Sequence, residues 1–363
     1  MTKIEAPTHP YLETLVPYEP PDLEAIAARA GLAVEQLIRL DANENPFGPS
    51  PRVAQALADY ADYAFYPYYR PLRRAVARYA GVPPEQVVLG NGADEIIDLL
   101  IRLFVEPGQS VVTCPPTFPM YRFYAEVNRC RVLSVPRRAD FSMDVATIEA
   151  TVWASEGNAR LLFLVSPGNP DGQAIPLDVI RRLLELPLMV AVDEAYIEFG
   201  GESGVSLLPE HENLIVIRTF SKWAGMAGLR LGYALLAPHL AGYLERIRAP
   251  YNVNAAAMVA ALATLADLET VQVNVTRLIA ERERLREALA TLPWLEPLPS
   301  QANFVLCRIR GHSSQEVVDA LAQRGILIRG FSDPRMAGYV RIGVGRPEYN
   351  ERLLAALREL DNQ

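Results

Sequence analysis

Cysteine and histidine are scarce in this chain of 363 residues, and their scarcity narrows the chemistry that the chain can perform. The cysteines are odd in number and far apart in the sequence, which predicts reduced thiols in the cytoplasm rather than a disulfide framework. No histidine has a partner at ligand spacing, so we expect no metal site and no Ser-His-Asp triad. The residues concerned are Cys114, Cys130 and Cys307, and His9, His211, His239 and His312, which we expect to be surface or structural.

A basic surface and long apolar runs are also absent. The net charge is -8 and no run of five like charges occurs, whereas a nucleic-acid partner would normally require a basic face. Residues 1–10 contain no apolar signal core, and the mildly apolar stretch 255–266 is shorter than the roughly 20 residues that span a bilayer. We therefore expect a cytoplasmic protein with neither nucleic acid nor membrane as a partner.

The length and composition of the chain are typical of a globular enzyme with more than one core. Half of its residues are hydrophobic and 21% are charged, and 363 residues exceed what one compact core usually holds. The first 40 residues contain five prolines and are expected to form an arm that packs on other elements. We predict three parts, namely an N-terminal arm packing with the small domain (1–40), a large domain (41–250) and a small C-terminal domain (251–363).

Helix and strand patterns alternate from about residue 70 to residue 240. Residues 71–79 form an amphipathic pattern, with Pro71 suited to the first helical position and Gly81 to the C-terminal cap. Several of the strand candidates are nearly continuous aliphatic runs, which is typical of strands buried on both faces. These candidates are residues 87–89, 110–113, 131–135, 161–165, 188–192, 214–217 and 233–236. The pattern predicts an α/β fold with a mostly parallel seven-stranded sheet flanked by helices.

The pattern changes after residue 251. A long helical segment rich in Glu and Arg covers residues 267–292, and a shorter helix is predicted near residues 314–323. Strand patterns cover residues 303–306, 326–328 and 339–344. This part of the chain is therefore predicted to form a smaller α+β unit.

Side chains that could take part in catalysis or ligand binding follow four of the predicted strands. In open α/β sheets, ligands bind outside the carboxyl ends of the strands, so these side chains should meet at one edge. They are Gly92, Ala93 and Asp94 at a helix start, Asn169, Asp193 with Tyr196, and Thr219 with Ser221 and Lys222. A lysine, a carboxylate with a phenol, an amide and an anion-binding helix end form the set that pyridoxal phosphate requires.

Each residue has a possible role toward this cofactor and an ordinary structural alternative. Lys222 would form the Schiff base, although a lysine after a strand is often a solvated loop residue. Asp193 would keep the pyridine nitrogen protonated, or it is simply a helix N-cap. Tyr196 and Asn169 would bond the 3-hydroxyl oxygen, although Asn169 also fits plain turn chemistry in its Asn-Pro-Asp-Gly stretch.

The phosphate of the cofactor would lie at the start of the helix that follows residues 87–89. The backbone amides of Ala93 and Asp94, at the positive end of that helix, would bind it together with Ser221 and Arg230. A dinucleotide fingerprint beginning at Gly90 is excluded because Glu95 stands where its third glycine would be. No P-loop sequence occurs either.

With these motifs the chain resembles the aspartate-aminotransferase superfamily of pyridoxal-phosphate enzymes (fold type I), and within it is similar to the histidinol-phosphate aminotransferases. The resemblance covers essentially the whole chain. Its most specific segments are residues 40–51, 91–95, 193–199, 218–222, 227–230 and 248–254. One departure occurs in residues 167–172, where the usual Pro-Asn-Asn-Pro-Thr-Gly of the family is Pro-Gly-Asn-Pro-Asp-Gly.

The resemblance implies roles that the spacing of residues does not reveal. It implies that Phe118 stacks on the cofactor ring and that Gly92 and Thr219 contribute to the cofactor site. It implies that Tyr66 reaches the cofactor phosphate of the other subunit, which makes the protein a homodimer. The substrate contacts that it implies are Tyr18, Asn43, Arg329 and Arg341.

The activity implied by the resemblance is amino transfer between histidinol phosphate and 2-oxoglutarate, forming imidazole acetol phosphate and glutamate in histidine biosynthesis. Two enzymatic alternatives remain open at this point, an aromatic or broad-range amino-acid aminotransferase and a threonine-phosphate-type decarboxylase. A cofactor-binding sensor of a transcription regulator would need an added DNA-binding domain, for which this length and acidic charge leave no room.

Overall fold

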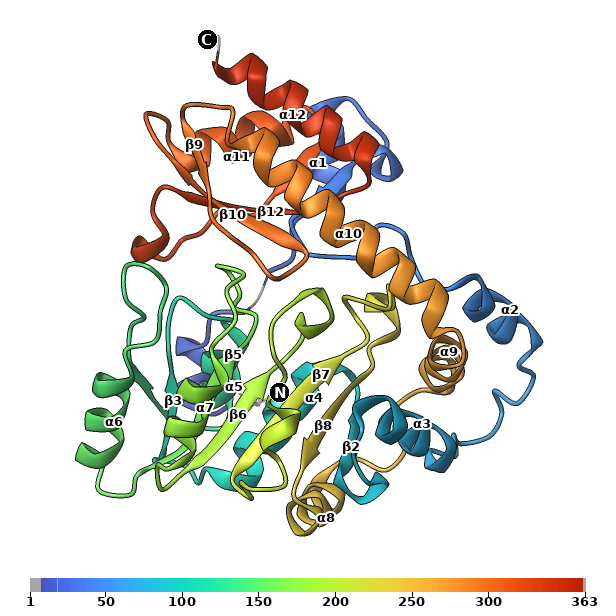
Figure 1. Cartoon of the computed structure of the whole chain (residues 1–363), viewed down its shortest axis with the longest axis vertical. Coiled ribbons are helices and arrows are strands. Elements are labelled where there is room, and N and C mark those ends of the chain that lie inside the picture. The colour runs from blue at the N-terminus through green and yellow to red at the C-terminus, as the bar shows by residue number, and fades with distance from the viewer. Residues whose placement is uncertain (1–7, 18, 362–363) are drawn as a thin grey trace, which may run out of the picture.

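The protein consists of a large sheet-based unit and a smaller unit above it, joined by one long helix (Figure 1). The structure, a computed structural model, describes residues 8–17 and 19–361. The helices are α1 (Leu23–Ala30), α2 (Pro51–Asp59), α3 (Arg70–Ala80), α4 (Gly92–Phe104), α5 (Met120–Val127), α6 (Val145–Ala154), α7 (Leu177–Leu184), α8 (Pro238–Ile247), α9 (Ala255–Leu265), α10 (Leu268–Leu289), α11 (Ser314–Ala322) and α12 (Pro347–Asp361).

The large unit is built on a seven-stranded sheet with the order β2-β8-β7-β6-β5-β3-β4. Its strands are β2 (Val87–Gly90), β3 (Ser110–Thr113), β4 (Arg131–Ser134), β5 (Ala159–Val165), β6 (Met189–Asp193), β7 (Leu214–Thr219) and β8 (Gly232–Leu236). Strands β3 to β7 are parallel, and β8 runs antiparallel to both β7 and β2. The seven strand segments predicted from the sequence are all present, and the predicted α/β fold with a mostly parallel sheet is confirmed.

Helices cover both faces of this sheet, which explains why its strands are aliphatic on both sides (Figure 1). Every residue of β7 is buried. Residues of α4, α5 and α8 pack on one face, and residues of α3, α7 and α9 pack on the other. Helix α3 agrees with its predicted pattern, since Gly81 caps its end with a φ of 73° and Leu72, Ala75 and Val76 are buried.

The small unit contains an antiparallel sheet with the order β12-β10-β9 and a parallel pair of strands, β1 and β11. These strands are β1 (Ile38–Leu40), β9 (Leu295–Pro297), β10 (Phe304–Ile309), β11 (Ile326–Ile328) and β12 (Tyr339–Gly343). Because β1 pairs with β11, and Ala27 of α1 packs in one cluster with Leu327, the part of the arm next to residue 41 lies against the small unit (Figure 1). The earlier part lies against the large unit instead, since the Tyr11 hydroxyl donates to the Val127 carbonyl oxygen at the end of α5 at 3.3 Å. Strands β1 and β9 were not predicted.

The division between the two cores differs from the boundary predicted at residue 250. Helix α9 and the first part of α10 pack into the core of the large unit, through residues such as Ala257, Val271 and Leu278. The end of α10 packs into the core of the small unit through Leu285 and Leu289. The change from one core to the other therefore falls inside α10.

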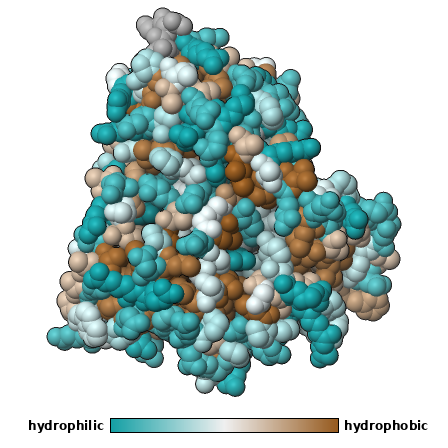
Figure 2. Space-filling view, in the orientation of Figure 1, coloured by the Kyte–Doolittle hydropathy of each residue, from teal (hydrophilic) through white to brown (hydrophobic). Residues whose placement is uncertain are grey.

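In the view of Figure 2 the surface is mostly hydrophilic over the small unit, and apolar residues gather in the middle of the molecule and beside α9. Within residues 8–17 and 19–361, no single helix is long and apolar enough to cross a membrane. Helices α9 and α10 pass that test only as a pair, and they meet at a bend of 85°.

Candidate active site

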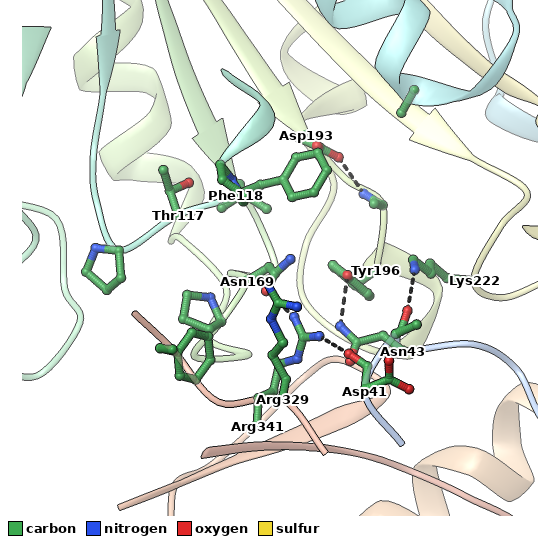
Figure 3. Close-up of a pocket in the computed structure, with 18 of the residues that line it drawn as sticks. Asp41, Asn43, Thr117, Phe118, Asn169, Asp193, Tyr196, Lys222, Arg329 and Arg341 are labelled. Carbon is green, nitrogen blue, oxygen red and sulfur yellow. Dashed lines mark hydrogen bonds between the residues drawn. The ribbon is translucent and has the colours of Figure 1, made fainter. Parts of the chain in front are cut away.

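A cavity of about 620 Å³ lies between the carboxyl ends of the large sheet and the small unit, as the close-up in Figure 3 shows. Strand ends of the large unit supply one wall, and Arg329 and Arg341 enter from the small unit. The predicted site residues that line it are Asn43, Ala93, Asp94, Phe118, Asn169, Asp193, Tyr196, Thr219, Ser221, Lys222, Arg230, Arg329 and Arg341. The residues predicted to follow the strands therefore do lie together at one edge of the sheet.

Lys222 lies just beyond β7, with its amine inside the cavity. Its Nζ donates a hydrogen bond to the Ala42 carbonyl oxygen at 2.9 Å and lies 5.9 Å from the centre of the Tyr196 ring. Asn43 is buried next to this carbonyl, and its Nδ2 donates to the Tyr196 hydroxyl at 3.1 Å (Figure 3). The segment between β1 and α2 therefore closes the cavity over the lysine and the phenol.

Asp193 ends β6 and is almost fully buried. Its carboxylate accepts hydrogen bonds from the Tyr121 hydroxyl at 2.7 Å and from the Ala195 backbone at 3.0 Å. Burial raises the pKa of Asp193 to about 6, because water is excluded from the charged form and these two donors offset only part of that penalty. A positive group placed in the cavity beside this carboxylate would restore its charge.

The start of α4 forms the anion-binding end of the cavity. Gly92 has a φ of 79°, and a Cβ atom there would lie 2.7 Å from a nitrogen of Arg230. Gly232 is equally constrained, because a Cβ atom on it would lie 2.5 Å from the Ala93 backbone nitrogen. Side chains are thus excluded where the helix amides and the Arg230 guanidinium face one space.

Hydroxyl groups complete this end of the cavity. The Thr219 hydroxyl donates to the Ser221 hydroxyl at 2.9 Å and accepts from the Ser221 backbone nitrogen at 3.1 Å. Arg230 also binds the Asp94 carboxylate at 2.6 Å, in a pair that is partly exposed. Helix amides, the Ser221 hydroxyl, which Thr219 orients, and a guanidinium together can donate hydrogen bonds to a phosphate group.

The opposite end of the cavity carries two arginines on neighbouring segments of the small unit. The backbones of Arg329 and Arg341 exchange hydrogen bonds at 3.0 and 2.9 Å, which places the two residues side by side. The Arg341 guanidinium donates to the Asn169 side-chain oxygen at 2.6 Å and to the Asp41 carbonyl oxygen at 2.5 Å (Figure 3). Two guanidinium groups in one cavity suit a substrate that carries an anion.

A buried ion pair links β7, which precedes Lys222, to the residue that follows Asp193 at the end of β6. Arg218 on β7 binds the Glu194 carboxylate with contacts of 2.9 and 3.0 Å, and both side chains are almost fully buried. Glu194 also accepts from the Ser203 hydroxyl at 2.9 Å and the Gly204 backbone at 2.6 Å. The ends of β6 and β7 are therefore held together directly behind the reactive groups.

Two of the predicted residues that the structure describes do not line the cavity. Gly92 lies behind it, at the start of α4. Tyr66 lies outside with a relative exposure of 77%, and its ring stacks on Tyr251 at 4.2 Å between centroids. Tyr18 lies outside the described residues.

Several residues of the site were missed by the sequence reasoning. Tyr121 holds the Asp193 carboxylate, and its place as the second residue of α5, three residues after Phe118, was an available but weak signal. The group of Ala42 that contacts Lys222 is a backbone carbonyl, so the residue type gives no indication of its role. Arg39 and Arg335 also line the cavity, and their distance from any predicted strand end hid them.

The chain is similar to known aminotransferases over nearly all of its length. A family model described as aminotransferase class I and II matches residues 35–357. The histidinol-phosphate aminotransferase of Roseiflexus castenholzii is 48% identical over 362 residues, covering 97% of each protein. The chloroplastic histidinol-phosphate aminotransferase of Nicotiana plumbaginifolia is 44% identical over 357 residues, which cover 96% of this chain and 85% of that protein.

A solved structure with the same arrangement is that of a histidinol-phosphate aminotransferase from Sinorhizobium meliloti in complex with pyridoxal-5'-phosphate. It superposes with a TM-score of 0.88 at 30% sequence identity, covering 100% of this chain and 99% of the other. Sequence and fold therefore agree on one family.

Proposed function

This chain belongs to the class I and II aminotransferases, and from that premise we propose that it transfers an amino group between histidinol phosphate and 2-oxoglutarate with pyridoxal phosphate. The observation that carries the proposal is the cavity itself. It joins an amine, a buried carboxylate and an anion-binding helix end to a pair of arginines (Figure 3). The products would be imidazole acetol phosphate and glutamate, which assigns the chain to histidine biosynthesis.

The cavity fits the cofactor on its own geometry. The absence of Cβ atoms at Gly92 and Gly232 lets the Arg230 guanidinium and strand β8 approach the start of α4, which brings the guanidinium beside the helix amides that would bind the phosphate. The Asp193 carboxylate, with its pKa raised by burial, is matched to a protonated ring nitrogen. Asn169 and Tyr196 would donate hydrogen bonds to the ring oxygen, and Phe118 would stack on the ring.

When bound, pyridoxal phosphate supplies an aldehyde that combines with amines and a ring that accepts electrons from the substrate carbon. Lys222 would be the amine that holds the cofactor, and its amine would also serve as the base that moves a proton at the substrate carbon. Tyr196 orients this end of the site through its bond to Asn43. The segment around Ala42 and Asn43 covers the lysine and limits the access of water.

The arginine pair would bind the anionic end of each substrate. Histidinol phosphate offers a phosphate and no α-carboxylate, whereas glutamate offers two carboxylates, so one pocket must accept both kinds of anion. The planar fork of arginine pairs bidentately with either group, which suits Arg329 and Arg341 to the task. Asn43 lines the same cavity and is proposed to contact the substrate as well.

We further propose a homodimer in which Tyr66 completes the site of the other subunit. The exposure of Tyr66 and its neighbours supports this, because a cluster of exposed aromatic side chains is typical of a contact surface. A cytoplasmic location is proposed from the cysteines, since Cys114, Cys130 and Cys307 are buried and unpaired.

The proposal is tested by offering the purified protein different amino donors with 2-oxoglutarate and following the absorbance of the bound cofactor. We expect histidinol phosphate to react with a much higher kcat/KM than unphosphorylated aromatic amino acids or threonine phosphate. The Lys222→Ala variant is the control, and it should lose turnover by about 10³-fold or more while keeping its fold. A preference for an unphosphorylated aromatic donor would contradict the substrate assignment.

A further inference from the structure

We propose that a buried ion pair between Arg137 and Asp171, together with Gly168, positions Asn169 against the cofactor ring. The inference rests on the proposed function, because Asn169 has this role only if pyridoxal phosphate occupies the cavity. Arg137 and Asp171 do not line the cavity themselves, so they act through the residues that they hold. Gly168 and Asp171 are also the two positions at which residues 167–172 depart from the usual family sequence.

The ion pair is well formed and shielded from water. The Arg137 guanidinium contacts the Asp171 carboxylate at 2.6 and 3.3 Å, one nitrogen to each oxygen. The two side chains have relative exposures of only 4% and 0%. A two-point contact between planar groups fixes orientation as well as distance, and burial protects it from screening by salt.

The turn that carries Asn169 is folded around this carboxylate. Asp171 Oδ2 accepts a hydrogen bond from the Gln173 backbone at 3.1 Å. The Gly168 backbone donates to the Gln173 carbonyl oxygen and accepts from the Gly172 backbone, both at 2.7 Å. A Cβ atom on Gly168 would overlap the Asp171 carboxylate, so this carboxylate can take its place only with glycine at 168.

Arg137 connects this turn to a second loop of the site. Its backbone nitrogen donates to the Pro115 carbonyl oxygen at 2.8 Å. Pro115 lies on the cavity wall three residues before Phe118, which is proposed to stack on the ring. Arg137, which follows β4, therefore couples the loop after β3 through its backbone to the loop after β5 through the ion pair.

The amide of Asn169 has a defined orientation in this arrangement. Its side-chain oxygen accepts the hydrogen bond from Arg341 at 2.6 Å, so the group that it can offer as a donor is Nδ2. That donor can reach a ring oxygen only if the turn keeps its place, because the side chain has two rotatable bonds. The ion pair restrains the backbone, and Arg341 restrains the amide.

The test compares the double variant Arg137→Met/Asp171→Asn with the wild-type holoenzyme. Both charges are removed together, because a single substitution would leave an unpaired buried charge and endanger folding. The readout is the pH titration of the absorbance of bound cofactor, together with the dissociation constant of pyridoxal phosphate. A hydrogen bond to the ring oxygen favours its unprotonated form, so losing it should raise the midpoint by about half to one pH unit.

Two further variants separate positioning from general stability. Arg182 and Glu149 form an exposed two-point ion pair between α6 and α7 at 2.7 and 2.8 Å, outside the cavity. The variant Arg182→Met/Glu149→Gln should leave the titration midpoint unchanged. In an Asn169→Ala background, removing the Arg137–Asp171 pair should produce little further shift, since both changes act on one hydrogen bond.

The possible outcomes distinguish a failure of the proposed function from a failure of the positioning role. If the wild-type protein fails to bind pyridoxal phosphate, the proposed function is wrong. If the wild-type protein binds and titrates normally but the double variant titrates identically, the positioning role is wrong even when its unfolding temperature falls. Equal shifts with and without Asn169 would also overturn it, because the pair would then act by another route.

Discussion

At the scale of a single residue, the buried carboxylate of Asp193 lowers the stability of the cofactor-free protein. Burial raises the pKa of its carboxyl group to about 6 from an ordinary value of 3.8. Between these two pH values the unfolded chain releases the proton and the folded chain keeps it, so the folded state loses stability as the pH rises. Above pH 6 the penalty is complete, on the order of 2–3 kcal/mol.

We therefore predict that Asp193→Asn stabilises the cofactor-free protein at pH 7.5. The neutral amide has the same shape and can keep the contact with the Tyr121 hydroxyl, so the substitution removes mainly the buried charge. Thermal unfolding of the two cofactor-free proteins measures the effect, and the advantage of the variant should shrink between pH 6 and pH 4. A variant that is less stable than the wild type at both pH values would contradict this account of the site.

Arg329 makes a second prediction at this scale, which concerns the choice of substrate. A hydrogen bond to a charged group contributes roughly 1.5–3 kcal/mol, so Arg329→Ala should raise the KM for histidinol phosphate by about 10- to 100-fold. An unphosphorylated aromatic donor should be affected far less. Arg308→Ala is a suitable control, because Arg308 is exposed on β10 and lies outside the cavity. Equal losses for both donors would favour a broad aromatic aminotransferase.

At the scale of secondary-structure elements, the sequence predicts well what depends on local pattern. Buried parallel strands such as β5 and β7 are continuous aliphatic runs, and their order along the chain already places Asn169 and Lys222 at one edge. Strands β1 and β9 have three residues each, and β1 pairs with a strand nearly 300 residues away. The equally short β11 was predicted because it is an aliphatic run, Ile-Leu-Ile, whereas a charged residue interrupts Ile-Arg-Leu in β1 and Leu-Glu-Pro in β9, so only their tertiary pairing reveals them.

The residues of the candidate site also fall into those that the local sequence reveals and those that it does not. Residues that directly follow strands were found, whereas Tyr121, the Ala42 carbonyl group and the Arg137–Asp171 pair were not. These partners lie between 34 and 180 positions along the chain from the groups that they bind. Their contacts depend on how loops and helices pack, which residue spacing alone does not determine.

At the start of α4, a substitution of Gly92 tests whether this helix end binds the cofactor phosphate. Gly92→Ala places a methyl group against Arg230 in a backbone conformation that favours glycine, so the guanidinium must move away from the phosphate position. We expect the affinity for pyridoxal phosphate to fall by about tenfold or more, as measured by fluorescence titration of the cofactor-free protein.

Gly81 provides a matched control for this substitution. It has a similar φ of 73° at the end of α3, but nothing lies within 4 Å of the position of a Cβ atom. Gly81→Ala should therefore share the backbone strain and the loss of stability, roughly 1 kcal/mol, without changing cofactor affinity. If both variants bind the cofactor equally well, the start of α4 does not form the phosphate site.

At the scale of the whole molecule, the cavity draws its walls from both units and leaves an aromatic segment unused at the surface. Tyr66 and Phe65 have relative exposures of 77% and 71%, and Tyr63 and Tyr68 are also exposed. So many exposed aromatic side chains in one short segment would be unfavourable in water unless another surface covers them. A second copy of the chain is the partner that the proposed function supplies, since its cofactor site would receive Tyr66.

This arrangement predicts that two impaired proteins recover activity when their subunits are mixed. Lys222→Ala and Tyr66→Phe proteins are each impaired, but in a mixed dimer one site would carry both lesions and the other site would carry neither. At equal mixing about half of the dimers are mixed and each has one intact site, so the activity should approach about one quarter of the wild-type level. The measurement is turnover of histidinol phosphate after mixing, with subunit exchange confirmed by differently tagged chains. If exchange occurs without any recovery of activity, each chain holds a complete site and Tyr66 serves only its own subunit.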